Sequence, residues 1–261
     1  MKIYADHAAT TAVSDTAMAA MLPCFQGIYA NPSSLHSPGQ RAAEKLAEAR
    51  EIFARNLNAA PREITFTSGG SESDVQALRT GAALGARKGK RHILSTKFEH
   101  HAVLHTLKAL EKEGFTVTLL DIPADGVVTA EAVREALRPD TCLVSVMFAN
   151  NEIGTIQPIA DIGALCREAG VLFHTDAVQA AGHLPIDVEA MHIDLLSMSA
   201  HKFRGPKGVG VLYARRGVAL ETVIHGGAQE RGKRAGTENL PGICGAAAAF
   251  DEACANLKEH A

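Results

Sequence analysis

One lysine in this sequence stands in a setting that suits covalent chemistry. Lys202 closely follows Ser199 and His201, while Asp176 and Gln179 lie about one crossover unit earlier, at the end of a strand-like segment. The amine of a lysine becomes nucleophilic when its pKa is lowered. A lysine for an aldehyde, a carboxylate for a ring nitrogen and donors for a phosphate are the groups that pyridoxal phosphate requires.

A glycine-rich segment offers a place for the phosphate. The residues from Thr67 to Ser71 read Thr-Ser-Gly-Gly-Ser and join a predicted strand to a predicted helix. Glycine lets the backbone approach an anion, and a helix N-terminus presents free N–H groups to it. Gly70 and the hydroxyl of Ser71 could therefore hold a phosphate. An ordinary strand-to-helix turn with a serine cap explains the same residues.

Asp176 and Gln179 lie where ligands of open α/β sheets bind, at the carboxyl end of a predicted strand. A carboxylate there could keep a pyridine nitrogen protonated, and Gln179 could donate to a ring hydroxyl oxygen. The alternative for Asp176 is a helix N-cap, which is an equally good use of aspartate.

A group of histidines is compatible with two kinds of chemistry. His100 precedes a predicted helix and could stack on an aromatic ring and carry protons near neutral pH. His101 and His105 would share one helix face, so with His174 and Asp176 they could instead bind the metal ion of a hydrolase. Surface histidines at a helix start are the plainer interpretation.

Two further polar segments remain open in the same way. Asn150 and Asn151 follow a predicted strand, where an amide could reach a ligand or simply form a turn. The segment 225–239 is rich in glycine and basic residues and contains Thr237, so it could reach a phosphate or form a mobile loop.

Composition excludes several classes of protein. The 261 residues are 46% hydrophobic, enough for a full core, and carry a formal net charge of −3 with no basic block, so nucleic acid is not an expected partner. No apolar run approaches the ~20 residues of a membrane helix, and the N-terminus does not resemble a signal peptide. The cysteines are 5 and widely spaced. They indicate neither a disulfide framework nor a zinc knuckle, and we expect a reducing cytoplasm.

Strand and helix patterns alternate along the chain, which predicts a mostly parallel sheet covered by helices. The carboxyl ends of its strands, and the polar residues that follow them, should share one side. Expected strands are 63–67, 92–95, 116–120, 141–147, 171–174, 193–197 and 209–213, and expected helices are 37–57 with Ser37 as N-cap, 71–87, 102–113, one capped by Thr129, 159–169 and 245–258.

Seven segments together carry a resemblance to one family. They are Asp6-His-Ala-Ala-Thr-Thr11, Thr67-Ser-Gly-Gly-Ser-Glu-Ser73, Glu99-His-His-Ala-Val103, Asn150-Asn-Glu-Ile-Gly-Thr-Ile-Gln157, His174-Thr-Asp-Ala-Val-Gln-Ala180, Ser199-Ala-His-Lys-Phe-Arg-Gly-Pro-Lys-Gly208 and Gly236-Thr-Glu-Asn239. In these segments the chain resembles the cysteine desulfurases of the NifS/IscS type, which are class V aminotransferases. The resemblance implies the large domain of a fold-type I pyridoxal phosphate enzyme, an α/β/α arrangement around a mostly parallel seven-stranded sheet.

The resemblance also implies a role for each matching residue. Lys202 would bond covalently to pyridoxal phosphate and later move the α-proton of L-cysteine, and His100 would stack on the ring and assist proton transfer. The remaining cofactor contacts would be Asp176 to the ring nitrogen, Gln179 and Asn151 to the ring oxygen, Gly70, Ser71, Ser199 and His201 to the phosphate, and Thr237 to the phosphate in a neighbouring subunit. The last contact implies a homodimer with shared sites.

Two departures from the family pattern affect the expected organisation. Ser71 stands where the family usually has threonine, which keeps the hydroxyl. The family carries its nucleophilic cysteine and a carboxylate-binding arginine in a region that would follow residue 261. We therefore expect residues 1–14 to be an N-terminal arm, 15–245 the pyridoxal phosphate-binding large domain, and 246–261 the start of a helix leading to a small domain that this sequence does not contain.

The expected function is that of a cysteine desulfurase, with a sulfur-acceptor or iron–sulfur scaffold protein as partner and no membrane. Three alternatives stay open. The chain could be a truncated fragment that binds pyridoxal phosphate without activity, a related lyase or aminotransferase such as a selenocysteine lyase, or the metal-dependent hydrolase of the histidine interpretation.

Overall fold

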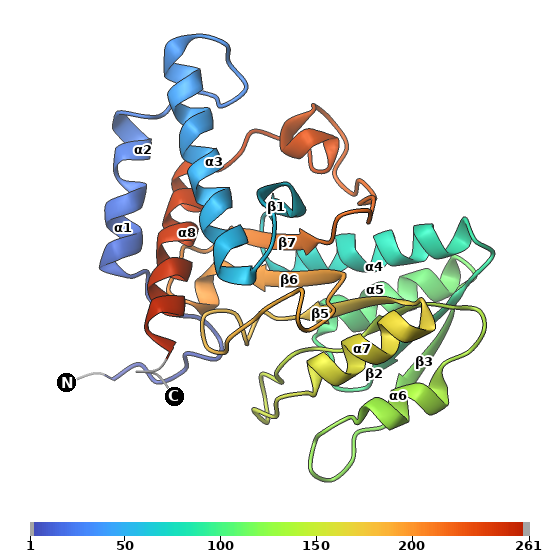
Figure 1. Cartoon of the computed structure of the whole chain (residues 1–261). Helices are drawn as coiled ribbons and strands as arrows, with labels where there is room; N and C mark the ends of the chain where they lie inside the picture. Colours follow the sequence, from blue (N-terminus) through green and yellow to red (C-terminus); the bar gives the residue numbers. More distant parts are fainter. Residues whose placement is uncertain (1–2, 258–261) are drawn as a thin grey trace.

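The computed structural model describes residues 3–257 as three layers built on one sheet (Figure 1). The sheet has seven strands in the order β1-β7-β6-β5-β4-β2-β3, and β7 runs in the direction opposite to the other six. The strands are β1 (Ile64–Thr67), β2 (His92–Thr96), β3 (Thr116–Leu120), β4 (Thr141–Ser145), β5 (Leu172–Asp176), β6 (Leu195–Ser199) and β7 (Gly210–Ala214). The predicted fold class is confirmed.

The strands are apolar because helices cover both faces of the sheet. Every residue of β2, β4, β6 and β7 is buried, as expected for strands covered on two sides. The edge strand β3 is partly exposed and carries threonines. On one face, α4 (Gly70–Ala86) and α5 (His101–Lys112) pack through a cluster that includes Leu78, Leu107 and Leu143.

The other face carries the largest apolar cluster. It joins α3 (Ser37–Leu57), α7 (Ile159–Ala169) and α8 (Leu240–Ala255) to the sheet. Phe53 of α3 stacks on Phe250 of α8, with ring centroids 5.0 Å apart, and meets Phe66 of β1 edge-on at 5.9 Å. Such aromatic packing fixes the helices against the sheet. The remaining helices are α1 (Asp15–Met21), α2 (Pro23–Gln26), α6 (Ala130–Ala136) and short 3-10 turns at Pro61–Glu63, Ala200–Lys202 and Gln229–Gly232.

The cap of one helix and the start of another differ from the sequence prediction, while α4 and α5 each begin one residue earlier than expected. His36, not Ser37, caps α3, because its Nδ1 accepts a hydrogen bond from the Gly39 N–H at 3.2 Å. The last helix begins at Leu240, five residues earlier than expected, because the Asn239 side chain caps it by accepting from the Gly242 N–H. The expected boundary at 245 therefore falls inside α8. Residues 1–2 of the expected arm and 258–261 of the expected last helix lie outside the described part of the chain.

Thr129 caps α6 as expected, by accepting from the Ala132 N–H. Within residues 3–257, no helix has the length and apolar character needed to cross a bilayer.

Candidate active site

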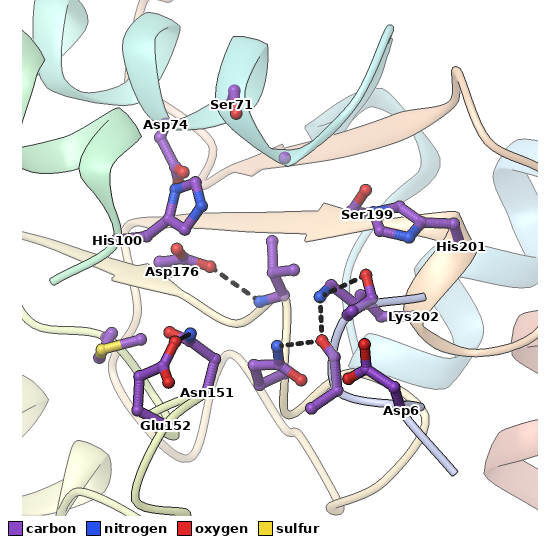
Figure 2. Close-up of a pocket in the computed structure, with 16 residues that line it drawn as sticks. Asp6, Ser71, Asp74, His100, Asn151, Glu152, Asp176, Ser199, His201 and Lys202 are labelled. Atoms are coloured by element: carbon purple, nitrogen blue, oxygen red, sulfur yellow. Dashed lines mark hydrogen bonds between the residues drawn. The ribbon is translucent and has the colours of Figure 1, made fainter. Parts of the chain in front are cut away.

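The predicted site residues meet in one cavity at the edge of the sheet (Figure 2). Its volume is about 470 Å³. Nine of the ten residues expected to contact a cofactor line it: Gly70, Ser71, His100, Asn151, Asp176, Gln179, Ser199, His201 and Lys202. The tenth, Thr237, lies elsewhere.

The sheet topology explains why residues far apart in sequence meet here. Strands β2, β4, β5 and β6 are parallel, and β1 has the same direction because β7 is antiparallel to both β1 and β6. The carboxyl ends of all five strands therefore share one edge, where ligands of open α/β sheets bind. Each strand is followed there by a segment that contributes to the cavity.

The start of α4 forms the end of the cavity that suits an anion. Gly70 is the first residue of this 17-residue helix, so the free N–H groups of the first turn lie beside the cavity. A side chain at Gly70 would not fit, because a Cβ there would lie 2.6 Å from Cγ2 of Val178. A second hollow of about 420 Å³ shares Gly70, Ser71, Ser199 and His201 with the cavity. These residues offer backbone, hydroxyl and ring N–H donors to a phosphate.

Lys202 projects into the cavity from the 3-10 turn after β6 and is half-buried. Its Nζ donates to the carbonyl oxygens of Ala8 and, at 3.0 Å, Ala9. Burial lowers the pKa of Lys202, and the charges of Asp176 and Asp6 oppose that shift. A lowered pKa raises the fraction of neutral amine, which is the nucleophilic form.

The N-terminal segment closes this part of the cavity. The Thr11 hydroxyl donates to the carbonyl oxygen of His201 at 2.8 Å, and the Thr10 hydroxyl contacts His201 Nδ1 at 3.1 Å. The Gln179 amide donates to the Ala8 carbonyl at 3.0 Å. Burial lowers the pKa of His201, and Lys202 adds to the shift. The segment thus places Gln179, His201 and Lys202 along one wall.

Asp176 is the last residue of β5 and is 3% exposed. Its Oδ1 accepts the Val178 N–H at 2.9 Å, which makes a turn and not the helix cap considered from the sequence. Burial raises the pKa of Asp176, opposed by the Val178 hydrogen bond and by the charges of His100 and Lys202. A cationic ring nitrogen would offset that burial.

His100 and Asn151 also line the cavity. His100 caps α5: its Nδ1 accepts the Ala102 N–H at 3.1 Å, which leaves Nε2 free for the cavity. The Asn151 amide donates to Glu152 at 2.6 Å, and both residues line the cavity. His100 is exposed and can therefore meet a planar ligand directly.

Thr237 lies outside this cavity, in a separate hollow of about 180 Å³. Its side chain is exposed, on a loop that an ion pair between Arg234 and Glu72, 2.9 Å long, ties to the first turn of α4. The structure therefore does not bring Thr237 to the nine other residues within one chain.

The metal-binding alternative does not fit the geometry. Among residues 3–257, the acidic, histidine and cysteine side chains that approach one another as a group of three, with ligand atoms within 4.8 Å, are Asp74, His100 and Asp176. The expected ligands His101, His105 and His174 do not join that group. His174 is fully buried, and its two ring nitrogens contact hydroxyls, Ser145 at 2.8 Å and Ser197 at 3.0 Å.

Sequence reasoning missed several residues that line the cavity: Asp6, Asp74, Met147, Glu152 and Val178. Asp74 is the most consequential, because it is an acid that is 1% exposed. Helical spacing could have found it, since residues three and four apart in a helix lie on the same face and Asp74 follows Gly70 and Ser71 at these distances. Glu99, which precedes His100 in the sequence, is 5% exposed, and the sequence pattern gave it no role beyond its place in the segment Glu99–Val103.

Comparisons with known proteins agree with this geometry. The model of the class-V aminotransferase family matches residues 3–259, so the chain belongs to that family. It is 53% identical over 259 residues to a cysteine desulfurase IscS of Clostridium botulinum and 54% identical over 244 residues to a putative cysteine desulfurase IscS 1 of Bacillus subtilis. These matches cover 99% and 94% of this chain but only 65% and 64% of the relatives.

Two solved structures are similar throughout the chain. A NifS-like protein superposes with a TM-score of 0.96 at 44% identity, covering 99% of this chain and 71% of the other. A structure described as SspA in complex with cysteine superposes with a TM-score of 0.91, also at 44% identity, covering 95% and 72%.

Members of this family depend on pyridoxal phosphate, and the residues of the cavity fit that cofactor. The site offers an amine on Lys202, a buried carboxyl on Asp176 and phosphate donors around a glycine that has no room for a side chain. This is the donor set that the three reactive parts of the cofactor need.

Proposed function

We propose that this chain is the cofactor- and substrate-binding part of a pyridoxal phosphate-dependent cysteine desulfurase, which converts L-cysteine to L-alanine and passes the sulfur to an enzyme cysteine. The observation that carries the proposal is the meeting of Lys202 and Asp176 in one cavity beside the start of α4. The resemblance to relatives named cysteine desulfurase supports the choice of reaction. L-Cysteine is the substrate proposed, because the similar SspA structure is described as a complex with cysteine.

The residues of the cavity would contact different parts of the cofactor. Asp176 would pair with the ring nitrogen, Gln179 and Asn151 with the ring oxygen, and His100 would lie against the ring face. Gly70, Ser71, Ser199 and His201 would hold the phosphate. When bound, the cofactor draws electrons away from the α-carbon of the amino acid. Lys202 Nζ would hold the cofactor and then accept the α-proton, since its lowered pKa favours the neutral amine.

Sulfur transfer needs a thiolate beside the substrate, and the five cysteines of this chain do not line the cavity. Burial raises the pKa of Cys142 to about 11 and the pKa of Cys166, Cys244 and Cys254 to about 12, so these thiols carry little thiolate at neutral pH. We propose that these 261 residues bind cofactor and substrate without completing persulfide formation. Sulfide release from L-cysteine and dithiothreitol that Lys202→Ala abolishes would contradict this part.

The exposed position of Thr237 supports a homodimer. Because Thr237 lies outside the cavity of its own chain, we propose that it reaches the cofactor phosphate in a second copy. The division into an arm over residues 1–14, a large domain and a helix leading to a further domain also stays a proposal, as do the sulfur-acceptor or iron–sulfur scaffold partner and the cytoplasmic location.

The visible absorption spectrum of the chain tests the cofactor role. After incubation with pyridoxal phosphate and removal of the excess, we expect a visible band that Lys202→Ala abolishes, because the covalent bond needs this amine. Lys97→Ala, which changes a surface lysine paired with Asp121, should keep the band. No band in the unmodified chain would contradict cofactor binding by these residues, and a band that persists in Lys202→Ala would contradict the role of Lys202.

A further inference from the structure

A second acid shares the cavity with Asp176. Asp74 of α4 is 1% exposed, and the nearest side-chain atoms of Asp74, His100 and Asp176 lie within 4.8 Å of one another. Figure 2 shows Asp74 and His100 pointing toward each other above Asp176. The Oδ1 atom of Asp74 is buried and has no hydrogen-bond partner among the described residues, whereas Oδ1 of Asp176 accepts the Val178 N–H. An unpartnered buried acceptor that faces a cavity indicates that a proton or a ligand belongs there.

Among residues 3–257, no buried cation balances these two carboxyls. His174 Nε2 lies 3.7 Å from Asp74 Oδ1, but burial lowers the pKa of His174 to about 3, so the ring is neutral at physiological pH. Lys202 donates to two backbone carbonyls, and His100 is exposed. Glu99, from the segment before α5, adds a third acid near Asp74. The groups around Asp74 are therefore mostly acidic or neutral.

Two carboxylates this close in a buried site cannot both be ionised at low cost. Burial is the largest cause of the raised pKa of Asp74, and the charges of Asp176 and Glu99 add to it, whereas hydrogen bonding with Ser197 opposes it. Burial raises the pKa of Asp176 as well, but the hydrogen bond from Val178 and the charges of His100 and Lys202 oppose that shift. One proton shared between the two carboxyls relieves this repulsion, as in other carboxyl pairs that share a site, and the charges of His100 and Lys202 favour the ionised form at Asp176.

We propose that Asp74 is a positioning residue of the cofactor site: it carries the single proton of a carboxyl pair with Asp176, so that Asp176 alone is left as the anion that faces the ring nitrogen. The proposal deepens the proposed function and rests on it, because the ring nitrogen is that of pyridoxal phosphate. The two carboxyls together then carry one negative charge, which matches the one positive charge of the ring nitrogen.

Two substitutions of Asp74 distinguish a role as a neutral hydrogen-bond donor from a role as a negative charge. Asp74→Asn keeps the shape and a hydrogen-bond donor without the charge, whereas Asp74→Leu removes the donor. We expect the dissociation constant for pyridoxal phosphate, measured by spectral titration at neutral pH, to rise about tenfold more in Asp74→Leu than in Asp74→Asn, which is the cost of one lost buried hydrogen bond. Equal losses in the two variants would overturn the proposal, because they would show that the charge of Asp74 is what matters.

The proton itself can be counted without the cofactor. Folded Asp74 has a pKa above the unfolded value, so the stability it contributes is present at low pH and is lost as the pH rises. Asparagine has no such dependence. In urea titrations, the ratio of the unfolding constants of the unmodified chain and Asp74→Asn should therefore increase as the pH rises above the unfolded pKa of about 4, by up to tenfold for each pH unit. Parallel curves would overturn the proposal even where Asp74→Leu does not fold.

A matched control is Glu99→Gln, which removes a neighbouring buried acid that does not line the cavity. It should change the dissociation constant for pyridoxal phosphate by less than about threefold, since it leaves the acid pair in place. A loss as large as that of Asp74→Leu would show that any nearby buried acid serves and would overturn a specific role for Asp74. If the unmodified chain does not bind pyridoxal phosphate, the proposed function fails, while the urea titrations still decide whether the pair holds a proton.

Discussion

Two regions of this molecule bury carboxyl groups in opposite ways. Glu230, with a side chain 2% exposed, receives two hydrogen bonds from Arg50, at 2.6 and 2.8 Å, and a third from the Phe66 N–H at 3.0 Å. Asp74 and Asp176 are as deeply buried, but within residues 3–257 no guanidinium pairs with them and Asp74 Oδ1 has no hydrogen-bond partner. The fold thus gives Glu230, which anchors a loop, a full set of charge and hydrogen-bond partners. It gives the two acids that line the cavity fewer partners.

The fully paired Glu230 holds an unfavourable turn of the backbone in place. Glu230 and Arg231 have φ values of 47° and 60°, a left-handed backbone that is unfavourable for side chains other than glycine. The ion pair to α3 and a hydrogen bond from Arg231 to the Ile64 carbonyl at 2.6 Å hold them there. This turn precedes Thr237, so the ion pair fixes the loop that we propose reaches a second subunit.

The largest effect on stability should come from breaking the completed region. Arg50→Ala leaves Glu230 buried without its partner, and we expect a loss of about 3–5 kcal/mol in the free energy of unfolding, because an uncompensated buried charge is costly. Urea denaturation measures it. Arg55→Ala, on the same helix, removes an exposed ion pair with Asp251 and should cost under about 1 kcal/mol. Equal losses in both variants would erase the contrast between the two regions.

The pH dependence of stability sharpens the comparison. Burial raises the pKa of Glu99 to about 8, although Thr96 and Met147 donate hydrogen bonds to it. A folded pKa above the unfolded value means that stability is complete below the unfolded pKa and is lost as the pH rises toward 8. The free energy of unfolding of Glu99→Gln, relative to that of the unmodified chain, should therefore rise by about 1.4 kcal/mol per pH unit between about pH 5 and pH 8. Stability differences that stay constant with pH would show that Glu99 is ionised.

The smallest expected effect concerns a single hydroxyl in the cavity. Ser71→Ala removes one donor from the proposed phosphate site, while the backbone N–H groups of α4 remain, so we expect the dissociation constant for pyridoxal phosphate to rise only about fivefold. Ser73→Ala is the matched control, because the Ser73 hydroxyl contacts Thr67 at 2.8 Å away from the cavity and should not alter binding. Equal losses in both variants would place the effect in the helix and not in the phosphate contact.

The sequence was informative wherever local pattern decides structure. Apolar runs of strand length predicted the seven strands to within a few residues, and alternation with helices predicted their parallel arrangement. Motif order placed Lys202, Asp176, His100 and Ser71 on segments that follow strands, and parallel strands bring such segments to one edge. The meeting of these residues in one cavity therefore followed from residue type and chain order, while their roles toward a cofactor are proposals that rest on the family resemblance.

Other features depend on contacts between distant segments, which no local pattern reports. The cap of α3 belongs to His36 because its ring reaches the Gly39 N–H, and the carbonyls of Ala8 and Ala9 meet Lys202 only after the N-terminal segment folds across the cavity. Asp74 shows the same limit, since its sequence position is that of an ordinary helical acid.

The sequence alone thus determined which groups this protein possesses and that they lie at strand ends, because residue type and periodicity are local properties. Only the tertiary structure decided which acids are buried together and which are paired. That outcome depends on the distance between α4 and β5 and on whether a guanidinium reaches the same space, as Arg50 does for Glu230 and no residue does for Asp74 in the described part of the chain.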